Sequence, residues 1–262
     1  MMKYLQRKRP PLAEIKIGRL PKVEKVCLKN NIPLYLIEAG TEDIMRIEFV
    51  FRAGQINEYL PLIASTTNMM LTEGSQNYTA NELNSTLDYL GAFINLSAEK
   101  DTAGLVIFFL SKHIRKITDL CSEILFKPVF PEKELDILMK KRARWFQISR
   151  EKVNNLSSDQ FFESVFGMHH PYGRQIRIND FPIITPAILN DFHSMHYRPS
   201  RMAVIISGRI HRDTVEIMDH YFGGLSEKSI YVEAPGSIIK GSEEKRIHIA
   251  KEDALQSSVR IG

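Results

Sequence analysis

The chain has 262 residues, of which 44% are hydrophobic and 25% are charged, and its formal net charge is +4. This is an ordinary globular composition with enough apolar side chains for a sizeable core. The apolar run at residues 105–110 is too short for a membrane-spanning helix, and residues 1–14 lack the hydrophobic segment of a secretory signal. We therefore expect a cytoplasmic protein with no membrane partner.

The positive charge is concentrated at the start of the chain. Residues 1–25 contain eight basic and two acidic side chains, a net charge of +6, which leaves the remainder at −2. A basic arm over residues 1–22 could contact nucleic acid, but no aromatic stacking pattern accompanies it. We expect a solvated or partner-packed arm and no nucleic-acid partner.

The chain has only two cysteines, Cys27 and Cys121. They are far apart in the sequence, and each has apolar neighbours. This pattern predicts reduced thiols in the core rather than a disulfide or a nucleophile.

The first elements have the alternation of β-strands. Apolar runs at residues 26–28 and 33–37 flank Asn30-Asn31, which predicts a hairpin. Alternating apolar and polar residues at 45–51 predict a third strand with one buried face, ending before Gly54.

An apolar helical pattern then runs from about Pro61 to Gly74. In such a helix Ser65, Asn68 and Met69 stand at positions i, i+3 and i+4 and share one face. This is the spacing of a helical metal site, yet none of the three is a usual metal ligand. By itself the stretch would be interpreted as core packing.

The middle of the chain alternates helices and strands. Thr79 and Glu82 form a capping-box pattern, which predicts a helix that ends at Gly91. A second hairpin follows over residues 92–97 and 102–110. The next helices are predicted over residues 113–126 and from Pro131 past residue 146. In the second of these we expect residues 140–144 to form a solvated basic face.

Further elements follow this long helix. Helices are predicted over residues 158–166, capped at Asp159 or a neighbour, and over residues 185–196, with proline in the first turn. A buried strand at residues 202–208 and a helix at 213–222 complete the pattern. Residues 223–244 have the composition of a linker, and residues 245–250 and 257–261 are predicted strands. The whole indicates an α+β fold.

Five landmarks, in order, resemble the insulinase/pitrilysin zinc peptidases and the mitochondrial processing peptidase subunits. They are the helix with Ala64, Met70-Leu71 and Gly74-Ser75; Gly91-Ala92-x-x-Asn95 with Asp101-Thr102; Lys127-Pro128-x-Phe130-Pro131-Glu132; His170-Pro171-Tyr172-Gly173; and His196-Tyr197-Arg198-Pro199-Ser200 followed by residues 204–208. The resemblance covers nearly the whole chain. It implies a two-layer domain, a mostly antiparallel sheet covered by helices, over residues 23–222. Residues 245–262 would begin a second, homologous domain.

The resemblance also implies where zinc chemistry would lie. In that family His-x-x-Glu-His supplies two zinc ligands and the general base. Ser65, Asn68 and Met69 occupy this frame here, and the third ligand position falls near Arg144 and Trp145. Serine and thioether are poor zinc ligands, and an amide cannot act as a base near neutral pH. We therefore expect no zinc, no other cofactor and no catalytic residue.

Other candidate chemistry is weaker. His193-x-x-His196 has metal-pair spacing, but the helix supplies no third donor there, so packing is favoured. His169-His170 precedes a turn and is expected to position the backbone. Scattered serines show no nucleophilic frame that the sequence can assemble.

A binding function could survive the loss of catalysis. In the family an edge strand binds peptide by adding it as a further strand through main-chain hydrogen bonds. The matching residues here are Phe93, Ile94, Asn95, Leu96 and Ser97. They are candidates for binding extended peptides, although a purely structural or covered hairpin stays an alternative.

The resemblance favours a non-catalytic subunit or half that shapes a peptide chamber, as a heterodimer with a catalytically intact homologous peptidase subunit. The alternative is an interaction or scaffold protein that has left proteolysis, as the family's respiratory-complex core subunits have. An active zinc peptidase is the least favoured, because the motif offers no ligands.

Overall fold

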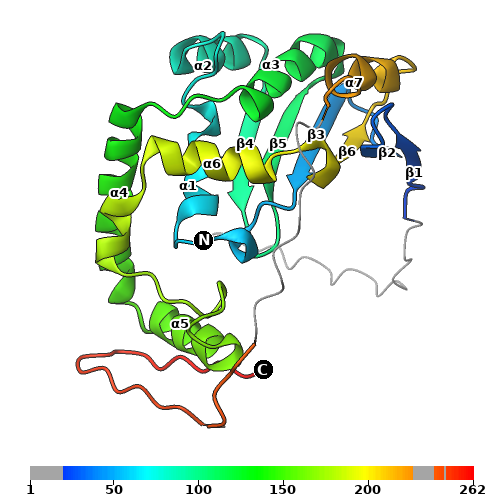
Figure 1. The fold of residues 1–262 in the computed structure, drawn as a ribbon. Helices are drawn as coiled ribbons and strands as arrows, with labels where there is room; N and C mark the ends of the chain where they lie inside the picture. The colour runs from blue at the N-terminus through cyan, green and yellow to red at the C-terminus, as the bar shows by residue number, and fades with distance from the viewer. Residues whose placement is uncertain (1–19, 227–238, 245) are drawn as a thin grey trace, which may run out of the picture.

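The computed structural model describes residues 20–226, 239–244 and 246–262. A six-stranded sheet with the order β1-β2-β6-β3-β5-β4 forms its centre (Figure 1). The strands are β1 (Glu24–Cys27), β2 (Pro33–Glu38), β3 (Ile44–Phe51), β4 (Phe93–Ala98), β5 (Ala103–Leu110) and β6 (Met202–Gly208). β2 and β6 are parallel, and the other four neighbouring pairs are antiparallel. The predicted, mostly antiparallel sheet is confirmed.

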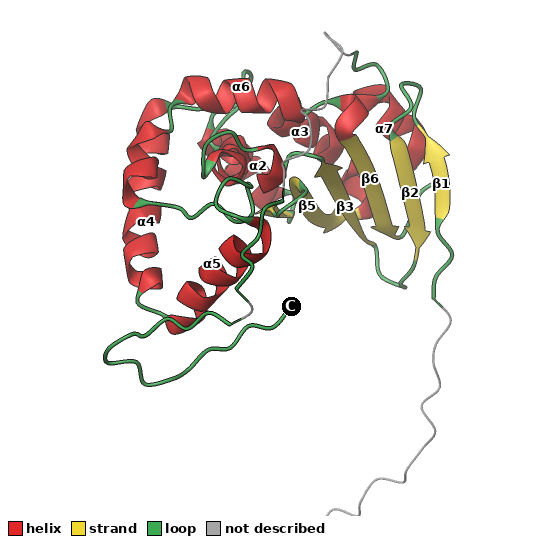
Figure 2. Cartoon of the chain, turned by 60° about the horizontal axis from the view of Figure 1, so that its bottom comes forward, coloured by secondary structure: helices red, strands yellow, loops and turns green. Residues whose placement is uncertain are grey.

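Helices accompany this sheet (Figures 1 and 2). They are α1 (Ile63–Met69), α2 (Ala80–Tyr89), α3 (Ile114–Phe126), α4 (Glu132–Arg150), α5 (Val153–Phe166), α6 (Pro186–His196) and α7 (Thr214–Phe222). α1 and α3 contact the strands on one face of the sheet, whereas α5 lies away from it. Alternate β3 residues, from Met45 to Phe51, point into the core, where the ring of Phe49 lies 5.1 Å from that of Phe222 on α7. On the opposite face Ile44 is exposed. The two-layer α+β fold is therefore confirmed.

Local sequence signals account for two helix starts. The Thr79 hydroxyl accepts a hydrogen bond from the Glu82 backbone N–H, and the Glu82 carboxylate accepts one from the Thr79 N–H. Thr185 caps α6 in a similar way, with Pro186 in the first turn. Both caps satisfy N–H groups that the helix itself leaves unpaired.

α5 begins five residues earlier than the sequence predicted, at Val153 instead of residue 158. The chain leaves α4 at Arg150 and needs only a short turn before Lys152 becomes the N-cap, without a capping side chain. The expected cap at Asp159 was therefore wrong. The helix ends at Phe166 as predicted, where Gly167 takes a positive φ of 84°.

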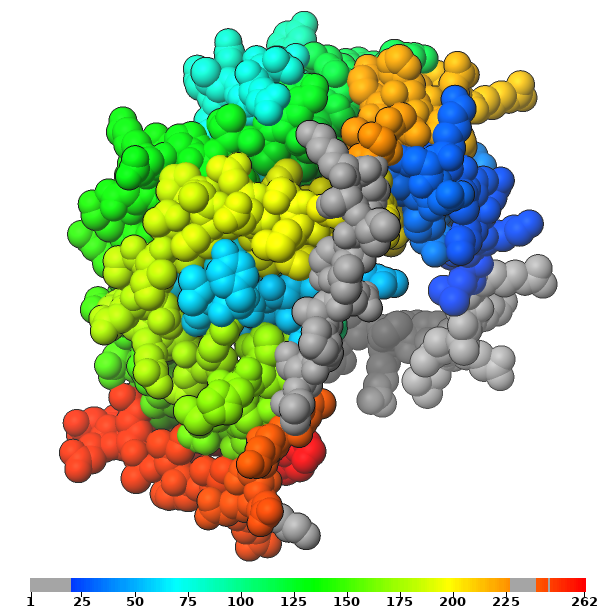
Figure 3. All heavy atoms as spheres, in the orientation of Figure 1, coloured from blue at the N-terminus to red at the C-terminus, as the bar shows by residue number. Residues whose placement is uncertain are grey.

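Residues 246–262 form no strand, so the strands expected near residues 245–250 and 257–261 are absent from the part of the chain that is described. An isolated strand has no neighbour to receive its backbone hydrogen bonds. The segment instead lies beside α5 (Figure 3). Side chains join it to the chain: Lys251 Nζ lies 2.9 Å from Oε2 of Glu151 at the end of α4, and the Ser258 hydroxyl lies 2.7 Å from that of Ser157 on α5.

The two thiols differ in environment. Cys121 on α3 is fully buried, as predicted, whereas Cys27 at the end of the outermost strand β1 is exposed. The core assignment of Cys27 was wrong because β1 pairs on one side only. None of the helices in the described part of the chain has the length and apolarity needed to cross a membrane.

Candidate functional site

The three motif positions on α1 point into different surroundings. Ser65 is half-buried, Asn68 is 1% exposed and Met69 is 46% exposed. At about 100° per residue, Asn68 is rotated by roughly 60° to one side of Ser65 and Met69 by roughly 40° to the other. This difference turns Asn68 toward the sheet and Met69 toward solvent. The side chains therefore do not converge on one point.

Ser65 faces an arginine from α4. The Nη2 atom of Arg142 donates a hydrogen bond to the Ser65 hydroxyl at 2.8 Å, and its Nη1 atom donates to the hydroxyl of Thr66. Burial lowers the pKa of Arg142, while the nearby Glu58 carboxylate raises it. The expectation that residues 140–144 form a solvated face was therefore wrong for Arg142.

The inward direction of Arg142 follows from the period of α4. Leu135 and Met139 form the buried side of this helix, and Arg142 stands three residues beyond Met139 on the same side. The Met139 sulfur also lies 3.8 Å from the Thr66 hydroxyl. By contrast, Trp145, near the position expected for a third ligand, is 61% exposed. The apolar period of α4 was the signal that could have identified Arg142.

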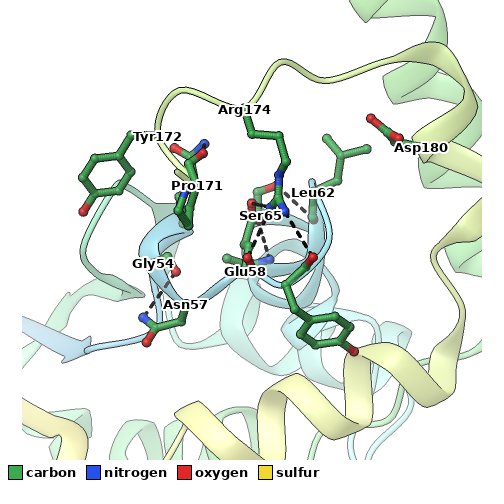
Figure 4. A network of polar contacts seen from close by, with 12 residues as sticks. Gly54, Asn57, Glu58, Leu62, Ser65, Pro171, Tyr172, Arg174 and Asp180 are labelled. Carbon is green, nitrogen blue, oxygen red and sulfur yellow. Dashed lines mark hydrogen bonds and ion pairs between the residues drawn. The ribbon is translucent and has the colours of Figure 1, made fainter. Parts of the chain in front are cut away.

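Sequence reasoning also missed a buried carboxylate beneath α1, at Glu58 (Figure 4). Its Oε1 atom accepts a hydrogen bond from the Ala64 backbone N–H at 2.8 Å, which satisfies a donor in the first turn of α1. Arg174 donates to the backbone carbonyls of Glu58 and Tyr59 at 3.2 and 3.1 Å. Burial raises the pKa of Glu58 to about 7, although the Ala64 N–H and Arg174 oppose the shift.

Asn68, which the family resemblance assigns to the general-base position, is hydrogen-bonded within the protein itself. Its side-chain amide donates to the Gly104 carbonyl at 3.0 Å and to the Tyr197 hydroxyl at 3.1 Å. These contacts join α1 to β5 and to the end of α6. A buried amide with these partners has no means of taking a proton from water.

The loop of residues 170–173 positions the backbone next to α1, as predicted. The ring Nδ1 atom of His170 accepts a hydrogen bond from the Tyr172 N–H at 3.1 Å. The Tyr172 hydroxyl donates to Asp101 in the β4–β5 turn. Gln55 donates to the Pro171 carbonyl at 2.8 Å. The loop thus holds the turn that ends β4.

The two histidines of α6 pack apart from each other, as the packing interpretation predicted. The His193 Nε2 atom lies 2.9 Å from the Leu125 carbonyl oxygen, and its ring stacks on Tyr197 with centroids 5.0 Å apart. The His196 ring lies against Phe192. Burial lowers the pKa of both histidines to about 4. Nowhere in the described residues do three His, Cys, Asp or Glu side chains gather closely enough to hold a metal ion.

The candidate peptide-binding strand is β4, at the end of the sheet. It pairs with β5 on one side, and no other strand of the described residues lies beyond it. Phe93, Asn95 and Ser97 point to the exposed side, whereas Ile94 and Leu96 are half-buried. An edge strand of this kind presents unpaired backbone N–H and C=O groups.

Two family descriptions match the chain. Residues 36–176 match the family described as "Insulinase (Peptidase family M16)", and residues 184–262 match "Peptidase M16 inactive domain". Cytochrome b-c1 complex subunit 1 of Caenorhabditis elegans is 23% identical over 227 residues, covering 81% of this chain and 45% of that protein. The β subunit of the mitochondrial-processing peptidase of Saccharomyces cerevisiae is 24% identical over 161 residues, covering 58% and 33%. The chain thus spans less than half the length of these relatives.

A solved structure gives the same fold. The peptidase M16 inactive domain from Pseudomonas fluorescens superposes with a TM-score of 0.75 at 23% identity, over 82% of this chain and 53% of that chain. At this identity the likeness concerns the fold alone. The match agrees with the sheet and helices described above.

The side chains at this site do not fit a zinc ion. Zinc takes imidazole, thiolate or carboxylate ligands, and Ser65 and Met69 offer a hydroxyl and a thioether. Ser65 already accepts the Arg142 hydrogen bond, and Arg142 has no lone pair to give a metal. The arrangement of hydrogen bonds holds α1 against α4.

Proposed function

Because the chain belongs to the insulinase family, peptidase family M16, we propose that it is a non-catalytic subunit or half of such a zinc peptidase. In this role it shapes a peptide-binding chamber together with an active homologue. One observation carries the proposal: the fold persists, while Ser65 and Asn68 are engaged in hydrogen bonds within the protein. In this proposal the chain retains the shape and the surface of the family's fold, whereas the residues needed for peptide hydrolysis are lost.

The proposal includes the loss of the metal and of the general base. Ser65, Asn68 and Met69 supply no zinc ligand and no carboxylate, so the chain by itself has no cofactor and cleaves no peptide. The match to a domain described as inactive agrees with this proposal.

The proposed partner is a catalytically intact homologue. The yeast relative is a subunit of a peptidase, and this chain spans a third of its length. We propose that residues 245–262 begin a second homologous domain after a linker, and that the assembly is cytoplasmic. Extended peptides would add to the free edge of β4, where Asn95 and Ser97 are exposed.

Co-expression with an active homologue from the same genome tests this proposal. We expect a stable heteromer on size-exclusion chromatography, with higher peptidase activity than the homologue alone. A homologue that still has His-x-x-Glu-His is the required partner, and the same homologue with its glutamate replaced is the control for contaminating activity. Separate elution at micromolar concentration, with full activity of the homologue alone, would contradict the proposal.

One observation favours a second candidate function, that of an interaction or scaffold protein without any role in proteolysis. The worm relative is a subunit of the cytochrome b-c1 complex. In that case the chain would form a stable complex whose peptidase activity does not depend on it. The co-expression experiment separates the two functions, because only the first predicts a gain of activity.

A further inference from the structure

We infer that the Arg142 guanidinium takes over the place of the metal in this fold, as the cation that joins α1 to α4 and keeps zinc out. The inference rests on the proposed loss of zinc and goes beyond it, since it assigns a residue to the vacated role. It concerns a single contact between two helices that are distant in the sequence.

The contact geometry supports a clamp. Arg142 bonds two successive hydroxyls of α1, those of Ser65 and Thr66, through its two terminal nitrogens. A guanidinium is planar, and its donors form a rigid fork, so one side chain can hold two acceptors at once. Thr66 is fully buried, and Ser65 and Arg142 are half-buried, which places the fork partly below the surface.

The charge of the site supports the same role. Glu58 lies close enough to Arg142 to oppose the loss of its proton, and Glu58 itself is 8% exposed. A buried charge is tolerated when it is hydrogen-bonded and paired. Arg142 thus has two hydrogen-bond acceptors on α1 and a buried carboxyl group in its vicinity.

A second cation would be repelled from this place. Zinc carries two positive charges and would have to lie within a few ångströms of Ser65, where the guanidinium now lies 2.8 Å from the hydroxyl. Like charges this close interact unfavourably even at the effective dielectric constant of about 20 that suits protein sites. Supplying ligands on α1 alone should therefore not restore metal binding.

The test restores the ligands on α1 and varies residue 142. The triple variant Ser65→His, Asn68→Glu, Met69→His is made with Arg142 retained, with Arg142→Met and with Arg142→Glu. Zinc affinity is measured by competition with a chelating dye, after circular dichroism has shown that each variant is folded. We expect Arg142→Met to tighten zinc binding by about tenfold or more over the Arg142 form, because it removes the positive charge and keeps an unbranched side chain. We expect Arg142→Glu to tighten it further.

Equal zinc affinity of the Arg142 and Arg142→Met forms would overturn the inference, whether both bind or neither binds. If the Arg142→Met form does not fold, the Arg142→Lys form is compared with the arginine form instead. Lysine keeps the positive charge, so the zinc affinity of this form should stay within about threefold of that of the arginine form. It should also be well below the zinc affinity of the Arg142→Glu form. None of these measurements needs the partner subunit. A co-expression experiment without heteromer formation would therefore contradict the proposed function, and the zinc-affinity result would remain valid.

The clamp also predicts a stability effect in the natural sequence. Arg142→Met should lower the melting temperature by several degrees, whereas Arg144→Met, at an exposed position on the same helix, should change it by about one degree or less. Ser65→Ala should have a smaller effect in the Arg142→Met background than in the natural chain, because the two residues share one hydrogen bond. Equal shifts for Arg142→Met and Arg144→Met would contradict the clamp.

Discussion

The Asn68 amide donates a hydrogen bond to the Tyr197 hydroxyl at 3.1 Å, across 129 residues of sequence. Both side chains are buried, and Asn68 also holds the Gly104 carbonyl of β5. Asn68, which the family resemblance assigns to the general-base position, connects a helix, a strand and the end of α6. In this structure the residue is part of the framework.

Asn68→Ala should therefore destabilise the fold. It leaves the buried Tyr197 hydroxyl and the Gly104 carbonyl without this donor, a loss that costs about 1–3 kcal/mol. The free energy of unfolding from urea titration measures the effect. Asn84→Ala on the exposed side of α2 is the control and should be neutral or slightly stabilising, since alanine favours helices. Equal values for the two variants would show that Asn68 is not a structural link.

Glu58 should make stability depend on pH. Its pKa is raised from 4.5 to about 7 in the folded protein, so the folded state binds more protons than the unfolded state between these values. The contribution of Glu58 to the free energy of unfolding is therefore fully present below pH 4.5. It is lost as the pH rises to about 7, by an amount on the order of 3 kcal/mol. Glu58→Gln should remove this loss, and Glu243→Gln, at an exposed position, should not.

The measurement compares variant and natural protein at each pH, because His193 and His196 act in the opposite sense. Their pKa values are lowered to about 4, so their contribution is lost as pH falls from 6.5 toward 4. In the difference between Glu58→Gln and the natural chain this contribution cancels. A difference that does not change between pH 5 and pH 8 would contradict the raised pKa of Glu58.

The edge of β4 should bind peptide through its backbone. Backbone pairing alternates from the hydrogen bond between Glu99 N–H and the Thr102 carbonyl, so the Leu96 N–H points to the free edge. Leu96→Pro removes this N–H and should weaken peptide binding by the assembled heteromer tenfold or more. Leu96→Val keeps the N–H and an apolar side chain, so it should bind like the natural chain. Fluorescence anisotropy with an extended peptide gives both affinities, and melting curves show that the sheet is intact. Equal binding by both variants would show that peptide does not add to this edge.

The two cysteines should differ in reactivity. Cys27 is exposed, whereas Cys121 is fully buried and burial raises its thiol pKa, so thiolate is scarce there. A thiol reagent should modify one group per chain in the native protein and two in denaturant. Cys27→Ser should abolish the native reaction. Rapid modification of two groups in the native state would contradict the buried position of Cys121.

Patterns within a few residues were sufficient for much of the fold. Neighbouring residues specify the Thr79–Glu82 capping box, the alternation along β3 and the helical period of α3. Each of these three predicted elements is present in the structure. The order of the five landmarks indicated the family, and the family match confirmed it. These features depend on side-chain spacing and on hydrogen bonds between residues three or four apart.

Only the tertiary structure decided what the site residues do. Sequence reasoning identified Ser65 and Asn68 as degenerate positions, but their partners Arg142 and Tyr197 lie 77 and 129 residues away. The apolar period of α4 could have shown that Arg142 lies on the buried side, but only the folded chain showed that Ser65 and Thr66 are its partners.

The remaining errors have the same origin. Cys27 is exposed because β1 has one neighbour, and residues 257–261 form no strand because they have none. An apolar neighbourhood in sequence does not specify how many sides of a strand are covered. By itself the sequence determined most of the elements up to Phe222, the fold family, and side chains at Ser65 and Met69 that are poor zinc ligands. The folded chain decided the contacts between elements, since these depend on which surfaces meet.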